Sequence, residues 1–192
     1  KIISELKTMP NVTLKNRSQV FGYYDHNMMV MFERVSDHLS KKSKYTPRQR
    51  LWYIRAKETI LSTGSIERPI VFGNNDTPGV VLSSAAKEYM KVYGVLVGRK
   101  PIIFTNNDTA YETAFEFKKN NIEPIILDSR EEHESEVVRE AKNKGIQIKF
   151  SYGVIVANGY KKVKSAKIGK LTKDKKSFEK IETINCDCIC VS

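Results

Sequence analysis

The spacing of hydrophobic and polar positions changes its period along the chain. Between residues 101 and 150, three short apolar runs alternate with two segments of helical spacing. The apolar runs are Pro101–Phe104, Pro124–Leu127 and Ile146–Phe150, and the helical segments are Asp108–Lys119 and Glu131–Lys144. Because strands joined through single helices by short links run parallel, this order predicts a right-handed, parallel α/β unit.

The residues before this unit predict a small antiparallel meander. The elements expected there are a helix end at Ile2–Met9 and strands at Val12–Leu14, Gln19–Tyr24, Met28–Val35 and Leu51–Ala56. The lysine-rich segment Ser36–Arg50 is expected to be a long hairpin loop. A further apolar strand, Lys57–Ser62, should return to a larger sheet and end at a Thr63-Gly64 turn.

Period two returns after residue 150 and favours antiparallel strands. These are expected at Val154–Val156, Val163–Ile168, Phe178–Ile181 and Cys186–Val191. Asn158-Gly159 is typical of a hairpin turn, and Lys170–Ser177 is expected to be an exposed loop. Ahead of the α/β unit, Ser83-Ser84 should cap a helix that runs through Tyr93 and stops at Gly94.

Composition narrows the class of protein. The chain has 192 residues, of which 40% are hydrophobic and 29% charged, which suits one large domain or two small ones. It lacks a run of about twenty apolar residues, so no membrane span is expected. The net charge of +11 comes from lysine clusters without interleaved aromatic residues. This favours solvated loops or contact with an acidic partner subunit, and argues against nucleic-acid binding.

Three cysteines stand at alternate positions, Cys186, Cys188 and Cys190. Structural zinc sites need four ligands and wider spacing, so we expect these residues to be small buried hydrophobes of a strand. Their odd number, without a secretion signal, fits a reducing, cytoplasmic compartment. Both ends of the sequence look like the middle of an element, which predicts a fragment of a longer polypeptide.

The first candidate site is the turn after the apolar strand at Pro101–Phe104. A dinucleotide site expects G-x-G-x-x-G/A there, so that backbone N–H groups can approach a pyrophosphate. The chain instead has Thr105-Asn106-Asn107-Asp108-Thr109-Ala110, which keeps only the last small residue. Asp108 suits a helix cap but would repel phosphate. Asp128 stands where an acid usually binds a ribose diol. A working dinucleotide site and a Rossmann-like scaffold without ligand both remain open.

The second candidate site is the Thr63-Gly64 turn. Gly64 can adopt a positive φ, and Ser65 beside it leaves room for a cofactor. Arg68-Pro69 then fixes an extended exit. An ordinary turn between a strand and a loop is the alternative. Other chemistry is poorly supported, because no histidine has a nucleophile at a known spacing. The segment Glu131-Glu132-His133-Glu134 fits a solvated helix start better than a metal site.

Two longer runs carry a family resemblance. The runs Arg50–Lys57 and Ser62–Val80, together with Phe104–Tyr111, resemble the α subunits of heterotetrameric sarcosine oxidases. The resemblance implies a Rossmann-like FAD/NAD(P)-binding three-layer α/β fold with an antiparallel β meander, of the two-dinucleotide-domain flavoprotein type. Residues 1–80 would then be part of the first nucleotide domain, and residues 81–192 an inserted NAD-domain-like unit.

The resemblance also implies a function. The whole enzyme would demethylate sarcosine oxidatively to glycine, with NAD in the α subunit and FAD, FMN and tetrahydrofolate elsewhere in the complex. Its β, γ and δ subunits would be the partners. The main glycine-rich loop would precede Lys1, so the fragment is expected to be inactive alone. The alternatives are a non-catalytic scaffold for subunit contact and a fragment of another amine-oxidising or pyridine-nucleotide flavoprotein. A disulfide reductase is disfavoured because C-x-x-C is absent.

Overall fold

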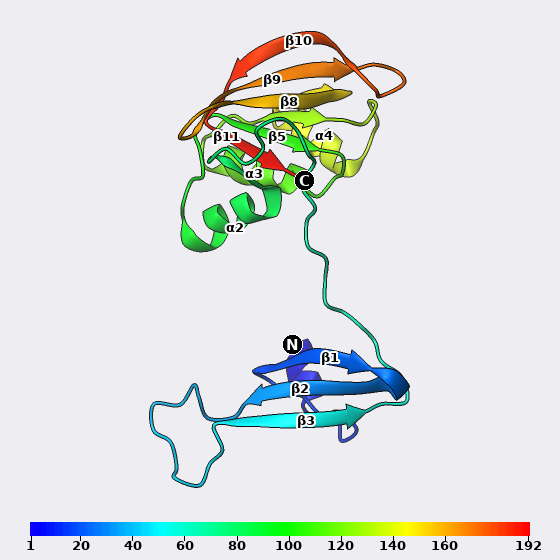
Figure 1. Cartoon of the computed structure of the whole chain (residues 1–192), viewed down its shortest axis with the longest axis vertical. Helices are drawn as coiled ribbons and strands as arrows, with labels where there is room; N and C mark the ends of the chain where they lie inside the picture. Colours follow the sequence, from blue (N-terminus) through cyan, green and yellow to red (C-terminus); the bar gives the residue numbers. More distant parts are fainter. The chain divides into compact units, whose positions relative to one another are not determined.

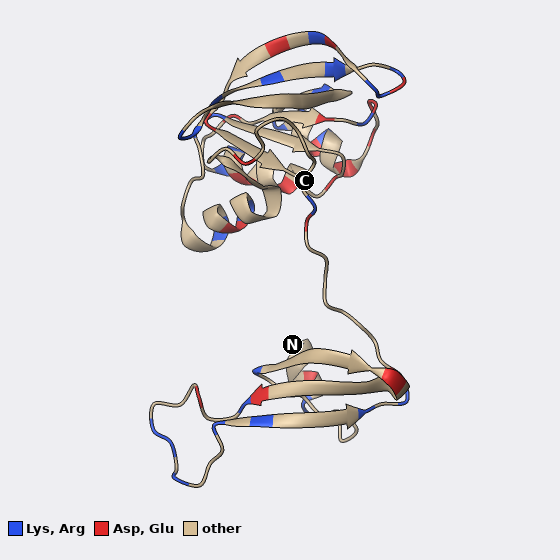
Figure 2. Ribbon diagram, viewed as in Figure 1, with Lys and Arg blue, Asp and Glu red and all other residues tan.

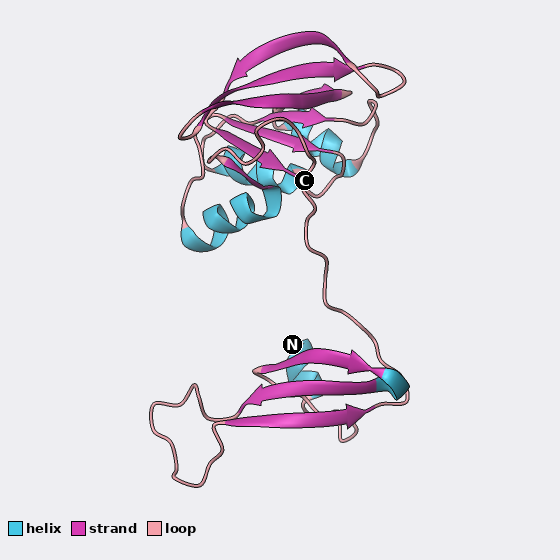
Figure 3. Ribbon diagram, in the orientation of Figure 1, coloured by secondary structure: helices cyan, strands magenta, loops and turns pink.

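Two three-stranded antiparallel sheets and one five-stranded parallel sheet make up the computed structural model, which describes residues 1–192 (Figures 1 and 3). By spatial contacts the chain divides into unit 1, Lys1–Gly64, and unit 2, Ser65–Ser192. The assignment of residues 1–80 and 81–192 to two nucleotide domains stays a prediction. None of the helices is both long and apolar enough to cross a bilayer.

Unit 1 is a meander in the strand order β1-β2-β3. Its elements are α1 (Ile2–Leu6), β1 (Ser18–Tyr24), the short 3-10 helix η1 (Asp25–Asn27), β2 (Met28–Arg34) and β3 (Gln49–Arg55). The helix and the three later strands predicted here are therefore present. The strand predicted at Val12–Leu14 is absent, and these residues pair with none of the three strands.

The apolar strand predicted at Lys57–Ser62 is also absent, and residues 56–72 contain no regular element. Ile60 and Leu61 are 91% and 70% exposed. An apolar run becomes a strand only where a neighbouring strand takes its backbone hydrogen bonds, and residues 57–62 pair with no strand. Gly64 does adopt the positive φ expected of it, +73°.

Unit 2 has three layers. Its elements are β4 (Val80–Leu82), α2 (Ser83–Tyr93), β5 (Pro101–Thr105), α3 (Tyr111–Lys119), β6 (Ile125–Asp128), α4 (Glu136–Asn143), β7 (Gln147–Phe150), β8 (Tyr152–Gly159), β9 (Val163–Leu171), β10 (Phe178–Asn185) and β11 (Cys188–Val191). The central parallel sheet has the order β4-β11-β5-β6-β7, and β8, β9 and β10 form a separate antiparallel sheet. The predicted parallel β-α-β-α-β unit is confirmed.

Each face of the parallel sheet has its own apolar core. The three helices cover one face, where Ile103 and Ile126 pack with Phe117 of α3. The β8-β9-β10 sheet covers the other face, where Ile102 and Leu127 pack against neighbours that include residues of β8 and β9 (Figure 3). Gly94 and Gly145 follow their helices with φ of +65° and +68°, the left-handed conformation that ends a helix.

The last strand corrects the sequence-based expectation. Cys186–Val191 was expected to continue the antiparallel alternation, but β11 returns to the parallel sheet and lies between β4 and β5. All four residues of β11 are buried, as expected for a central strand with both faces covered. Cys188 and Cys190 face the helices and Cys186 belongs to the opposite core, so the expectation of buried cysteines is confirmed.

Both later helices begin further along the chain than predicted. The helix expected from Asp108 begins at Tyr111, preceded by Ala110 without a side-chain cap. The helix expected from Glu131 begins at Glu136, because the side chain of Ser135 accepts the Val138 N–H and caps it. Residues 131–134 therefore precede the helix instead of forming its first turn.

Candidate functional site

A crevice of about 610 Å3 opens in unit 2 near the carboxyl ends of β5 and β11. In α/β sheets, ligands bind outside the carboxyl ends of strands where the strand order reverses. Here β5 leads through α3 to β6 on one side, whereas β11 lies on its other side. The crevice is lined by Ser65, Ile66, Glu67, Arg68, Pro69, Ile70, Ser84, Asn106, Asn107, Thr109 and Ser192.

The loop after β5 is braced by its own side chains. The buried Thr105 hydroxyl donates to the Asn107 carbonyl oxygen at 2.9 Å and accepts the Asn107 N–H at 3.0 Å. The Asn107 side-chain oxygen accepts both the Thr109 N–H, at 3.0 Å, and the Thr109 hydroxyl, at 2.6 Å. Its amide nitrogen donates to the hydroxyl of Ser192 at 3.0 Å.

This bracing changes what the loop can bind. In a glycine-rich loop, free backbone N–H groups and the absence of Cβ atoms let a pyrophosphate approach. Here the amide oxygen of Asn107 already takes the N–H of Thr109, and side chains stand at the glycine positions. The loop residues therefore do not fit a pyrophosphate in this conformation.

A second helix start at the crevice is occupied by a carboxylate. An oxygen of Glu67 accepts the Ser84 N–H at 2.8 Å and the Ser84 hydroxyl at 2.6 Å. Leu82, which precedes α2, provides no side-chain cap, so Glu67 caps this helix from seventeen residues away. A negative charge at a helix N-terminus is stabilising, and it also disfavours a second anion at this position.

Asp128, the predicted ribose ligand, is fully buried and engaged by its own chain. It accepts the Tyr111 hydroxyl at 2.8 Å, and Arg130 donates to it through its backbone N–H, Nε and Nη2 at 2.7–3.0 Å. Burial and then the charge of Asp128 raise the pKa of Tyr111 far above its ordinary value, so the phenol stays a donor. Asp128 is therefore not free to bind a ribose diol.

Asp108 turns toward the same guanidinium and does not cap a helix. Its carboxylate lies 2.7 Å from Nη2 of Arg130 and 3.7 Å from Nε2 of His133. Burial opposes its ionisation, but the Arg130 guanidinium holds the pKa of Asp108 below its ordinary value. Arg130 thus joins the ends of β5 and β6 through two carboxylates.

The sequence-predicted site residues fall into three groups. Ser65 and Arg68 line the crevice together with Asn106, Asn107 and Thr109. Thr105 is buried beneath the loop, while Asp108 and Asp128 pair with Arg130. Thr63 and Gly64 belong to unit 1 and do not line the crevice.

Sequence reasoning missed Glu67, Ser84 and Ser192 as crevice residues. The prediction that Ser83-Ser84 caps this helix was wrong, because Glu67 caps it instead. The bond between Glu67 and Ser84 joins residues too far apart for a local motif to reveal. Ser192 reaches the crevice because β11 inserts beside β5, a placement that the period of the sequence did not predict.

Metal and thiol chemistry find no support in the side-chain arrangement. Histidine, cysteine, aspartate and glutamate do not gather anywhere in groups of three or more that could hold a metal ion. Cys188 and Cys190 lie with their sulfurs 3.7 Å apart inside the core. Burial raises the pKa of the Cys186 thiol to about 12, so this cysteine is not a nucleophile at neutral pH.

Curated proteins similar to this chain share one name, although no family model matches it. Sarcosine oxidase subunit alpha from Rhizobium meliloti (strain 1021) is 45% identical over 127 residues, which are 66% of this chain and 13% of that protein. The protein of the same name from Corynebacterium sp. (strain U-96) is 34% identical over 158 residues, or 82% of this chain and 16% of that protein. The chain spans about one seventh of the length of these relatives.

Solved structures share the fold at low sequence identity. Thioredoxin reductase from T. acidophilum is 17% identical, with a TM-score of 0.52 over 67% of this chain and 41% of that one. Bacillithiol disulfide reductase from Bacillus cereus is 14% identical, with a TM-score of 0.58 over 99% of this chain and 53% of that one. Identities this low establish the fold alone. The chain belongs to the family of sarcosine oxidase α subunits, as a segment with a thioredoxin-reductase-like FAD/NAD(P)-binding fold.

Proposed function

We propose that this chain is part of the nucleotide-binding portion of an oxidoreductase subunit whose whole enzyme demethylates sarcosine oxidatively to glycine. The observation that carries the proposal is the 34–45% identity to proteins named sarcosine oxidase subunit alpha. In this assembly NAD belongs to the α subunit, and FAD, FMN and tetrahydrofolate to other parts. The β, γ and δ subunits are its partners, and residues 1–80 contribute to the first nucleotide domain, with Thr63-Gly64 at one wall of its site.

For unit 2 we propose a scaffold role without a bound dinucleotide. Three contacts support this role. Asn107 occupies the N–H of Thr109, Glu67 occupies the start of α2, and Arg130 holds Asp128. A dinucleotide needs free N–H donors for its pyrophosphate, a helix start open to anions and a free carboxylate for its ribose. The contact of Asn107 removes the first, that of Glu67 the second and that of Arg130 the third.

Isothermal titration calorimetry of the 192-residue chain tests the scaffold role. We expect no saturable heat with NAD or NADP, and therefore a dissociation constant weaker than about 1 mM. The control is the variant Asp128→Asn, which should behave in the same way because Asp128 is not available to a ligand. If the unchanged chain binds NAD or NADP with micromolar affinity and Asp128→Asn abolishes this binding, unit 2 contains a functional dinucleotide site and the scaffold role is refuted.

The reaction is tested by flavin reduction. The chain supplied with FAD should give no loss of flavin absorbance on addition of sarcosine under anaerobic conditions. The complete enzyme that contains this subunit should give rapid bleaching, because the amine-oxidising flavin is proposed to lie in the β subunit. Bleaching by the isolated chain would refute the proposed division of labour. An inactive complete enzyme would refute the choice of substrate.

A further inference from the structure

The pair Asn158-Gly159 lies outside the crevice, at the end of β8. It is the single Asn-Gly pair in the chain. The sequence predicted a hairpin turn at this pair, but the two residues are the last of β8, and residues 160–162 make the turn to β9. Both residues are exposed, so solvent reaches the Asn158 amide and the peptide bond that follows it.

The backbone requires glycine at position 159. Gly159 has a φ of +150°, which residues with a side chain rarely adopt, and a Cβ atom added there would overlap the carbonyl oxygen of Lys162. A side chain at this position would also hinder the approach of the Asn158 amide to the backbone nitrogen of residue 159. The fold therefore places an unhindered peptide nitrogen directly after an exposed asparagine.

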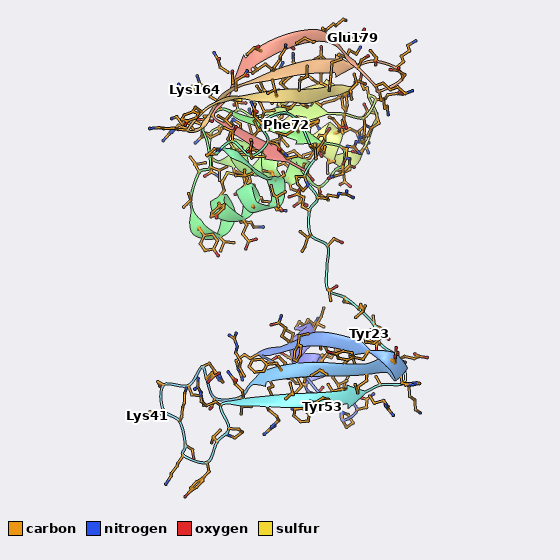
Figure 4. All side chains as sticks on the ribbon, in the orientation of Figure 1. Tyr23, Lys41, Tyr53, Phe72, Lys164 and Glu179 are labelled. Carbon is orange, nitrogen blue, oxygen red and sulfur yellow. The ribbon has the colours of Figure 1, made fainter.

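The β8–β9 ladder is irregular at the same pair. Asn158 pairs with Ser165 and Gly159 with Val163, so Lys164 is left as a bulge on β9. Figure 4 labels Lys164 at this end of the hairpin. The Asn158 side-chain nitrogen donates to the Ser165 hydroxyl at 3.2 Å, which is long for such a bond. An extended strand holds an asparagine amide away from the next peptide nitrogen, but an exposed strand end beside a bulge opens locally at low cost.

The hairpin around this pair contains lysines and no acid. Residues 152–171 include no aspartate or glutamate, and the turn itself carries Lys161 and Lys162 (Figure 2). Neighbouring positive charge favours the charged form of an anionic group. A deprotonated nitrogen of Gly159 and a carboxylate at position 158 are both such groups, so the surroundings favour reaction between them and its acidic product.

We propose that Asn158 is a site of spontaneous deamidation, independently of the reaction of the whole enzyme. The deprotonated backbone nitrogen of Gly159 attacks the side-chain carbon Cγ of Asn158 and forms a five-membered succinimide ring. The bond between Cγ and Nδ2 breaks, and the nitrogen leaves as ammonia with a proton from water. Water then adds to either carbonyl carbon of the ring and opens it to aspartate or isoaspartate. The sum of the steps consumes one water and releases one ammonia, without an oxidant or a cofactor.

The isoaspartate product alters the backbone beside a set of tertiary contacts. Isoaspartate carries the chain through its side-chain carbon, so the backbone gains one atom at position 158. At the preceding residue, the Ala157 N–H donates to the Gly73 carbonyl oxygen at 2.9 Å, and the Ala157 carbonyl oxygen accepts the Asn74 side-chain amide at 3.0 Å. These bonds hold the loop that begins at Gly73 against β8. We therefore expect faster amide hydrogen exchange at Ala157 in the isoaspartate form.

Incubation of the 192-residue chain in oxygen-18-labelled water at mildly alkaline pH, followed by peptide mass spectrometry, tests the site. The Asn158 peptide should lose its amide nitrogen and gain one labelled oxygen. The references are Asn11 and Asn16, which are also exposed but are followed by Val12 and Arg17. Conversion at Asn158 should be about ten-fold faster or more, because only glycine leaves the attacking nitrogen unhindered. Equal rates at the three asparagines would overturn the proposal.

Hydroxylamine tests the succinimide itself, because it attacks the ring and cleaves the chain after residue 158. The folded chain should yield fragments 1–158 and 159–192. The matched control is Asn158→Gln, which keeps an exposed amide but would need a less favourable six-membered ring. Circular dichroism should show that this variant folds normally, and it should give neither fragment. An uncleaved native chain, or equal cleavage of the variant, would refute the proposed route.

Discussion

Replacing Arg130 with alanine is expected to lower the free energy of unfolding of unit 2 by about 3 kcal/mol. The reason is the burial of its partner. Asp128 is 0% exposed, and three of its four hydrogen bonds come from Arg130. The variant loses the two side-chain bonds and leaves a buried carboxylate that only Tyr111 and one backbone N–H contact. Asp108 loses its ion pair with Arg130 as well.

Urea denaturation followed by far-ultraviolet circular dichroism measures this loss. The matched control is Arg139→Ala, because Arg139 lies on the exposed side of α4 and forms no ion pair. Surface substitutions of this kind change stability by about 0.5 kcal/mol or less. If the two variants unfold at the same urea concentration, Arg130 does not hold the ends of β5 and β6 together.

The parallel core of unit 2 could be predicted because its signals are local. The apolar run before Thr105 is buried on both faces as β5, and Ala114 and Phe117 meet the sheet at helical spacing. Glycines at 94 and 145 end the preceding helices within one or two residues of the expected positions. Each signal lies within one element and its neighbouring turn, so the sequence alone contains it.

The errors share a different physical cause, since each depends on a partner far away in the sequence. Cys188–Val191 has an alternation that suits either kind of sheet, and only pairing with β4 and β5 makes it parallel. The run Lys57–Ser62 has strand-like composition but pairs with no strand. Strand propensity mainly reflects packing against neighbours, so composition alone could not decide either case.

The sequence indicated which loop residues line the crevice, but not the hydrogen bonds that those residues form. A turn after the first strand of a parallel unit indicated Asn106, Asn107 and Thr109, and these residues do line the crevice. The hydrogen bonds that fill the site could not be predicted. The sequence showed that Arg130 follows Asp128 closely. It did not show that the guanidinium of Arg130 occupies the Asp128 carboxylate, which is then not available to a ligand.

The second large effect is expected from the core between the parallel sheet and its helices. Phe117 of α3 is 0% exposed, among Ile103, Ile126 and Ala114. Phe117→Ala should lower the free energy of unfolding of unit 2 by about 3–5 kcal/mol, because it removes buried apolar surface and leaves a cavity. The matched control is Phe21→Ala in unit 1, since Phe21 is 59% exposed.

The single tryptophan makes this prediction specific to one unit. Trp52 lies in β3, so its fluorescence reports unit 1, whereas all α-helices except α1 belong to unit 2 and dominate the signal at 222 nm. In Phe117→Ala the circular-dichroism transition should move to lower urea while the fluorescence transition stays in place. A joint shift of both transitions would mean that the two units unfold together as one cooperative unit. The division of the chain after Gly64 would then not separate two independent folding units.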